Sequence, residues 1–217
     1  MLQLCITPPA FAGEDVNTIR KHARYVLRES LDSDISIYLY ASDEKDVLCD
    51  DNLGGVACQT ENDHEITGHY KLIVMRVVLG VPDDAEILSS VDVGGKTFRP
   101  VSPNNLQPEF FKIPKVKDKF ITIKEAANSM DRTYTTLFRL DDKNKIFPVK
   151  FFLKDGKEFN DSGDLSVEYN KLRMYISWIR GDLSDEEFKE RKMPGKYEGT
   201  AQTIYFTYKD GNFYESE

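Results

Sequence analysis

The second half of the chain contains the stretch Ile121-Thr122-Ile123-Lys124-Glu125-Ala126-Ala127, followed at residues 131–140 by Asp-Arg-Thr-Tyr-Thr-Thr-Leu-Phe-Arg-Leu. Thr122 and Glu125 have the spacing of a capping box, in which a threonine hydroxyl accepts from the amide three residues on and the glutamate reaches back. This spacing predicts a short helix over 123–129. A second helix, capped by the aspartate or threonine at its start and ending with the stretch, is expected after a brief turn.

The residues that follow predict a β-hairpin, a further helix and a second hairpin. Residues 146–159 hold two apolar runs around the turn Lys154-Asp155-Gly156-Lys157, which is typical of a hairpin. Ser166 can cap a helix that is closed by Gly181. Residues 203–214 hold two further apolar runs around an Asp-Gly turn. Helix, turn, helix and hairpin in this order indicate a winged helix-turn-helix.

This part of the chain resembles the excisionase and MerR-like winged helix-turn-helix family through residues 121–127, residues 131–140 and Ile146-Phe147-Pro148-Val149-Lys150. The resemblance implies binding of double-stranded DNA. The side chains that it implies at the major groove are Arg132, Thr133, Thr135, Thr136 and Arg139, and those at phosphates are Lys124, Lys154 and Lys157. The alternative is a helical hairpin and β-turn whose lysines are simply solvated.

Charge is unevenly placed along this acidic chain, whose net charge is -8. Residues 112–154 contain 11 Lys and Arg against 5 Asp and Glu, a balance of +6, whereas residues 1–111 contain 9 against 18, a balance of -9. A phosphate backbone responds to local charge rather than to the whole-chain value. A DNA partner for the second half therefore stays open.

The first half predicts alternating strands and helices. Apolar runs predict strands over 2–7, 35–40, 71–79 and 97–101, and apolar spacings of three and four predict helices over 16–31 and 83–91, with a long polar loop over 41–69. These elements indicate a small open Rossmann-like α/β sheet in residues 1–102. A proline-containing linker is expected over 103–119, followed by the winged helix-turn-helix-like α+β domain over 120–217.

The first half also weakly resembles Rossmann-like domains related to nucleoside 2-deoxyribosyltransferases. The similar residues include Ile6-Thr7-Pro8-Pro9, Gly13-Glu14-Asp15, Tyr38-Leu39-Tyr40, Asp50-Asp51-Asn52, Leu79-Gly80 and Gly95-Lys96. The resemblance implies cleavage of an N-glycosidic bond, with Glu86 as the carboxylate nucleophile and Asp50 or Asp51 holding the sugar. The alternative is that Glu86 is an acid in the first turn of a helix, favoured there by the helix dipole.

Other features of the sequence indicate the cellular compartment and whether a cofactor is expected. The odd set Cys5, Cys49 and Cys58 argues against a disulfide framework, and no apolar run approaches the length that crosses a bilayer, so a cytoplasmic protein is expected. Cys49 and Cys58 precede His64 and His69, but their spacing matches no usual zinc motif. We therefore predict no metal and no cofactor.

Three functions remain open at this point. The first is a DNA-binding or regulatory protein whose α/β domain is non-catalytic and serves assembly, including a possible homo-oligomer, or senses a ligand. The second is an enzyme that cleaves or transfers the N-glycosidic bond of a nucleoside or nucleotide. The third is an acidic protein-interaction module without DNA binding.

Overall fold

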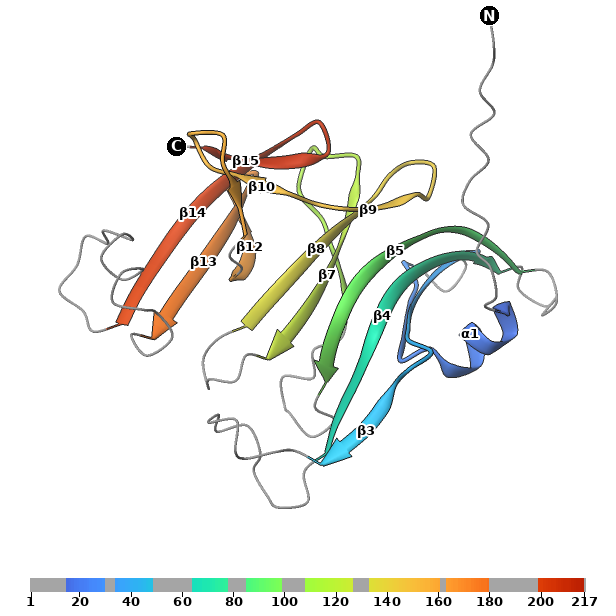
Figure 1. Ribbon diagram of the computed structural model, residues 1–217. Helices are drawn as coiled ribbons and strands as arrows, with labels where there is room; N and C mark the ends of the chain where they lie inside the picture. Colours follow the sequence, from blue (N-terminus) through green and yellow to red (C-terminus); the bar gives the residue numbers. More distant parts are fainter. Residues whose placement is uncertain are drawn as a thin grey trace, which may run out of the picture.

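The computed structural model describes residues 15–29, 34–48, 64–77, 85–98, 108–126, 133–160, 163–179 and 199–216 (Figure 1). Within these ranges one helix, α1 (Val16–His22), precedes fifteen strands. The predicted Rossmann-like α/β sheet followed by a winged helix-turn-helix is therefore wrong. No helix in the described ranges is long and apolar enough to cross a membrane.

The strands form three sheets that follow the order of the chain. Sheet A contains β1 (Tyr25–Leu27), β2 (Ile35–Tyr40), β3 (Lys45–Leu48), β4 (His64–Val77) and β5 (Ala85–Phe98). Sheet B contains β6 (Glu109–Phe111), β7 (Lys119–Ala126), β8 (Thr133–Leu140) and β9 (Ile146–Pro148). Sheet C contains β10 (Phe151–Phe152), β11 (Glu158–Phe159), β12 (Asp164–Glu168), β13 (Lys171–Ile179), β14 (Gly199–Lys209) and β15 (Asn212–Ser216).

Nearly all neighbouring strands are antiparallel. Sheet A has the order β1-β2-β4-β3 with β5 also paired to β4, and sheet B has the order β6-β7-β8-β9. Sheet C has the order β11-β10-β15-β14-β13-β12, in which β10 and β15 are parallel. Register shifts at Tyr70/Lys71 and Val74/Met75 interrupt the long β4–β5 ladder. Bulges of this kind bend a strand, and both strands curve along their length in Figure 1.

Sheet B is the middle layer of a three-layer stack, because successive residues of its strands enter different cores. In β7, Ile121 and Ile123 belong to a core shared with sheet A, whereas Phe120 belongs to a core shared with sheet C. In β8, Phe138 faces sheet A and Leu137 faces sheet C in the same way. This alternation follows from the two-residue period of a strand.

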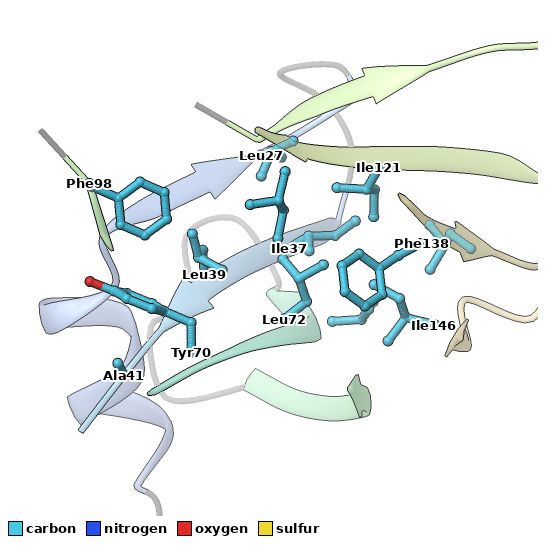
Figure 2. Packing of buried hydrophobic residues seen from close by; sticks show 13 residues of the cluster. Leu27, Ile37, Leu39, Ala41, Tyr70, Leu72, Phe98, Ile121, Phe138 and Ile146 are labelled. Atoms are coloured by element: carbon cyan, nitrogen blue, oxygen red, sulfur yellow. The ribbon is translucent and has the colours of Figure 1, made fainter. Parts of the chain in front are cut away.

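The core between sheets A and B is drawn in Figure 2. From sheet A it includes Leu27, Ile37, Leu39, Tyr70, Leu72 and Phe98, and from sheet B it includes Ile121, Phe138 and Ile146. The Phe98 ring meets the Tyr70 ring edge-on, with centroids 5.1 Å apart. Residues on both sides of 103–119 thus bury their side chains in one core.

Helix α1 covers the other face of sheet A. Its only buried residue, Ile19, packs with Tyr38, Tyr40 and Met75. The carboxylate of Asp15 accepts from the Thr18 amide at 3.1 Å and caps the helix. The predicted helix over 16–31 is thus correct only in its first part, because the chain becomes extended at Ala23 and enters β1.

Each of the two cores that sheet B shares with a neighbouring sheet includes a tyrosine whose hydroxyl binds a carboxylate that an arginine also binds. On the sheet A side the hydroxyl of buried Tyr70 donates to Glu44 at 2.7 Å, and Arg24 donates to the same carboxylate. On the sheet C side Tyr208 donates to Asp118, which also pairs with Arg139 at 3.4 Å. Burial is the main cause that raises the pKa of both tyrosines, and the carboxylates raise it further.

Four segments predicted as helices are strands. Residues 83–91 fall largely in β5, residues 123–129 begin in β7, and residues 133–140 form β8. The predicted helix that starts at Ser166 is the β12–β13 hairpin, which turns at Tyr169-Asn170, where both residues have positive φ angles of 50° and 64°. Residues 133–140 and 166–179 are rich in β-branched and aromatic residues, which fit a pleated surface better than a helix.

Several predicted strands and turns are confirmed. The strand predicted over 35–40 is β2, and the one predicted over 71–79 lies in β4 as far as Val77. The predicted loop over 41–69 is interrupted by β3 and the start of β4. Both predicted hairpins form, as the β10–β11 and β14–β15 pairs. At the second, Asp210 and Gly211 have φ angles of 51° and 87°, which the preferred two-residue hairpin turn requires.

Candidate functional site

The residues predicted for the major groove do not form a recognition helix, because 133–140 is the buried strand β8. Thr135 is buried, and its hydroxyl has no hydrogen-bond partner among the described residues. Arg139 is partly buried, pairs with Asp118 and lies with its guanidinium 4.3 Å from the ring centroid of Phe147. Thr133 and Thr136 are in the same strand, and Arg132 lies outside the described residues. The helix-turn-helix basis for these DNA contacts is thus removed.

The lysines predicted for phosphates are not gathered on one surface element. Lys124 is in β7 and pairs with Glu109 at 3.7 Å. Lys154 and Lys157 share the β10–β11 turn, where Lys157 pairs with Asp155 at 3.0 Å. The three lysines thus come from two different sheets, and two of them already have an acidic neighbour.

The proposed nucleophile Glu86 lies in β5 directly opposite Arg76 of β4. Its carboxylate is largely exposed and accepts from Arg76 at 3.0 Å, so it is a cross-strand ion-pair partner rather than an acid in a helix. Arg76 is also 3.5 Å from Asp34. Arg76 is exposed, although its neighbours in β4 are buried, and both of its partners lie outside the predicted 41–69 loop. Asp50 and Asp51 lie outside the described residues.

The two histidines of the possible zinc set bind carboxylates instead. The His64 Nδ1 atom lies 2.6 Å from Asp46, and the His69 Nε2 atom lies 2.8 Å from Asp92. Within the described ranges no three His, Cys, Asp or Glu side chains are grouped so that they could hold a metal ion. Cys5, Cys49 and Cys58 fall outside those ranges.

A different group of residues stands out on the face of sheet C that points away from sheet B. Phe152, Tyr175, Tyr205 and Tyr214 lie there, and we call them the outer aromatic stripe. Their direction follows from their neighbours, because Phe151, Met174, Ile176, Ile204, Phe206 and Phe213 all enter the core beneath. Sheet C lies at the end of the stack opposite α1 (Figure 1).

The strand register makes the stripe diagonal. Tyr175 of β13 is opposite Thr203, so Tyr205 of β14 is one same-face position further along. Tyr205 is opposite Ser216, so Tyr214 of β15 is one further same-face position along the diagonal. Phe152 of β10 is directly opposite Tyr214. Side chains on such diagonals are about 7–8 Å apart, within reach of one ligand.

The stripe is open to solvent. Tyr175 and Tyr214 are 37% and 39% exposed, and Tyr205 and Phe152 are partly exposed. The Phe152 and Tyr214 rings are stacked, with centroids 5.1 Å apart and an angle of 15° between their planes. Each ring of this pair therefore turns its other face away from its neighbour.

Polar side chains surround the rings. The exposed hydroxyls of Thr203 and Thr207 lie on β14 on either side of Tyr205, and Ser216 of β15 is directly opposite Tyr205. Hydroxyl groups both donate and accept hydrogen bonds. The face therefore combines apolar rings with neutral hydrogen-bonding groups.

Glu168 links two of the strands under the stripe. Its carboxylate accepts from the Tyr205 hydroxyl at 3.0 Å, and this hydrogen bond is the main cause that raises the pKa of Tyr205. The same carboxylate lies 3.7 Å from the Arg173 Nε atom. The Arg173 guanidinium lies 5.7 Å from the ring centroid of Tyr175. These contacts restrict the positions of both tyrosines. A glycine is required nearby, because a Cβ atom on Gly163 would lie 2.1 Å from the Tyr175 carbonyl oxygen.

Comparison with family models, with curated proteins and with solved structures found no match for the chain. The geometry of the described residues therefore carries the functional argument by itself.

The helix predicted from Ser166 concealed the outer aromatic stripe. Leu172, Tyr175 and Ile176 fit helical spacing, but Leu172, Met174 and Ile176 also alternate with Arg173 and Tyr175, which is the strand period. That alternation was the available signal for one ring. The register that aligns all the rings joins strands far apart in the chain and has no local signal.

Proposed function

We propose that this chain binds a linear, uncharged glycan along the outer aromatic stripe. The observation that carries the proposal is the diagonal of four partly exposed rings on four adjacent strands, with hydroxyl side chains between them. By the strand spacing and the diagonal offsets, the rings extend over roughly 20 Å.

The chemistry of a sugar polymer matches both components of this face. The C–H groups on one side of a pyranose ring form an apolar surface that packs against an aromatic face, while its hydroxyls point outward around the ring. Binding sites for small molecules likewise combine aromatic walls with a few placed polar groups. Thr203 and Thr207 are positioned to supply these polar groups beside Tyr205, and the Ser216 hydroxyl, which donates to the Tyr205 carbonyl at 3.4 Å, can still accept.

The shape of the face favours a polymer over a compact ligand. The stripe lies on a solvent-exposed face of a sheet, where a single sugar would contact only one or two rings. A longer chain adds contacts ring by ring, and it gains affinity because each new contact outweighs the cost of ordering one more unit. We therefore expect affinity to rise with the length of the oligosaccharide until the stripe is covered.

The charge of the face argues against two other occupants. The charged side chains of β12 and β13 on this face balance, with Lys171 and Arg173 against Asp164 and Glu168. Single-stranded nucleic acid also stacks on aromatic rings, but it requires a positively charged groove for its phosphates. A stable protein partner covers about 800 Å² with a continuous apolar centre, whereas hydroxyl side chains interrupt the rings here.

The proposal is tested by titrating the full chain with soluble neutral polysaccharides, including β-glucans, xylan, mannan and an α-glucan, by isothermal calorimetry and affinity electrophoresis. We expect Tyr205→Ala to weaken binding about tenfold, which corresponds to about 1.4 kcal/mol. Tyr169→Asn is the matched control, since Tyr169 is 88% exposed in the β12–β13 turn and lies outside the stripe.

Three outcomes contradict the proposal. The first is an absence of binding to the whole panel by a folded sample. The second is an equal loss in Tyr205→Ala and Tyr169→Asn. The third is binding of single-stranded oligonucleotides that falls steeply with salt and depends on the same tyrosine, which would instead assign the stripe to nucleic acid.

A further inference from the structure

A second candidate site lies in the connection between β6 and β7. Residues 112–114 and 116–119 line a hollow of about 350 Å³. The run of residues 112–119 contains four lysines, namely Lys112, Lys115, Lys117 and Lys119, and all except Lys115 line the hollow. This segment is the start of the basic region of the sequence.

The segment is held firmly to the fold beneath it. Ile113 is 3% exposed and packs in the core between sheets B and C. The Val116 amide donates to the Ile113 carbonyl at 3.2 Å, and Lys115 between them has a positive φ of 69°. Asp118 is engaged by Tyr208 and Arg139. The lysines thus project from a fixed turn rather than from a free loop.

At the rim of the hollow, the chain supplies one anion of its own. The carboxylate of Glu29, which follows β1 of sheet A, accepts from Lys112 at 3.0 Å and from Lys119. The hydrogen bond from Lys119, followed by that from Lys112, lowers the pKa of Glu29. Two ammonium groups therefore already converge on a single oxyanion at this place.

The contacts of Glu29 can be displaced. Its side chain is 36% exposed, and those of Lys112 and Lys119 are 69% and 40% exposed. Ion pairs that reach solvent to this extent contribute little, because water and salt screen them. Among the described residues, Lys115 and Lys117 have no acidic partner, so positive charge remains available in and beside the hollow.

We propose that this hollow binds a small multivalent oxyanion, a phosphate or a polycarboxylate, and that Glu29 is a built-in competitor that releases Lys112 and Lys119 when the ligand binds. Lysine ammonium groups suit such a ligand because they act as compact point charges with three donors each. A multivalent anion offers more charge to the lysines than the single carboxylate of Glu29. This site is independent of the outer aromatic stripe.

The competition makes an unusual prediction about Glu29. Removing a carboxylate near a basic site normally changes its affinity for anions only through the long-range charge. Here Glu29→Gln also frees two ammonium groups that line the hollow, so we expect the affinity for an added oxyanion to rise about threefold. Lys117→Gln removes a cation that pairs with no acid in the described part of the chain, and it should weaken binding by a similar factor.

The experiment is calorimetric titration of the full chain at low ionic strength with two ligands, inorganic pyrophosphate and citrate, which distinguish the phosphate from the carboxylate source. Lys154→Gln is the matched control, because it changes the net charge by the same amount at an exposed turn of sheet C. Thermal unfolding of each variant verifies that the fold is kept.

The proposal is supported when Glu29→Gln tightens binding, Lys117→Gln weakens it and Lys154→Gln leaves it unchanged. It is overturned when Lys117→Gln and Lys154→Gln have equal effects, since the binding then reflects net charge alone. It is also overturned when folded Glu29→Gln binds more weakly than the natural chain, or when neither anion binds to the natural chain. If Glu29→Gln fails to fold, a loss with Lys117→Gln but not Lys154→Gln still supports the anion site.

Discussion

Sheet B is antiparallel, and sheet C is antiparallel except for its β10–β15 pair. They expose very different sequences because, among the described elements, sheet B is covered on two faces and sheet C on one. In β7 the four successive residues 120–123 are at most 3% exposed. In β13 buried Leu172 and Met174 alternate with the more exposed Arg173 and Tyr175. Burial of both faces removes the polar and apolar alternation by which a strand is identified. A one-sided sheet keeps it and is free to present a row of side chains to a ligand.

The largest expected effect is a difference in stability between two variants, each of which replaces one phenylalanine, in sheet B or in sheet C. Phe138 of sheet B is 2% exposed in the core shared with sheet A, whereas Phe152 of sheet C lies on the outer aromatic stripe. We expect Phe138→Ala to lower the free energy of unfolding by about 3–5 kcal/mol, because it leaves a cavity. Phe152→Ala should cost about 1 kcal/mol or less and weaken glycan binding instead. Urea denaturation measures both, and equal losses would contradict the layered arrangement.

The next effect concerns the close approach beneath the stripe. A Cβ atom at Gly163 would lie 2.1 Å from the Tyr175 carbonyl oxygen, so Gly163→Ala forces the backbones of β12 and β13 apart. We expect a loss of about 2 kcal/mol, typical of overpacking, together with weaker glycan binding as Tyr175 moves. Gly95→Ala is the control, since a Cβ atom there meets nothing within 4 Å. A Gly163→Ala protein as stable as Gly95→Ala would show that the strands separate freely.

A third effect is the pH dependence of stability that arises from one tyrosine on each side of sheet B. Burial raises the pKa of Tyr70 on one side and of Tyr208 on the other, and Glu44 and Asp118 raise it further. An unfolded tyrosine ionises near pH 10. Above that pH the unfolded chain loses a proton that the folded chain keeps, so each tyrosine lowers the unfolding free energy by about 1.4 kcal/mol per pH unit.

The contribution of these tyrosines to stability is therefore fully present below about pH 10 and lost as the pH rises toward their folded pKa values. Urea midpoints between pH 8 and 11 should fall less steeply in Tyr208→Phe and in Tyr70→Phe than in the natural chain. Below pH 9 the slopes of the three proteins should coincide. A natural chain whose stability is constant up to pH 11 would show that neither hydroxyl is held in its neutral form.

Local signals in the sequence predicted the turns better than the layers. The Asp-Gly turn at residues 210 and 211 specifies its hairpin because few residues accept two positive φ angles in succession. The capping-box spacing of Thr122 and Glu125 also looked local and specific. It was misleading because the threonine hydroxyl instead donates, at 3.4 Å, to the Glu109 carbonyl of the neighbouring strand β6.

Neither candidate site could be predicted from the sequence, because both depend on contacts between distant residues. Phe152 and Tyr214 stack although they are 62 positions apart in the chain. Lys112 and Glu29 are 83 positions apart. Composition did identify the basic region that begins at Lys112. It did not show which of those lysines surround a hollow and which are paired with acids on other strands.

The smallest predicted effect returns to the face of sheet B that packs toward sheet C, where two threonines differ in one respect. The buried hydroxyl of Thr135 has no hydrogen-bond partner among the described residues, whereas that of Thr122 donates to Glu109. An unpaired buried hydroxyl costs free energy on folding, and valine has nearly the same shape without that group. We expect Thr135→Val to raise the unfolding free energy by about 1 kcal/mol and Thr122→Val to leave it unchanged or lower it. Chemical denaturation of the two variants side by side resolves this difference. The sequence alone placed Thr135 in a DNA groove, where losing its hydroxyl would leave stability unaltered, so the sign of this one change distinguishes a buried strand from an exposed recognition helix.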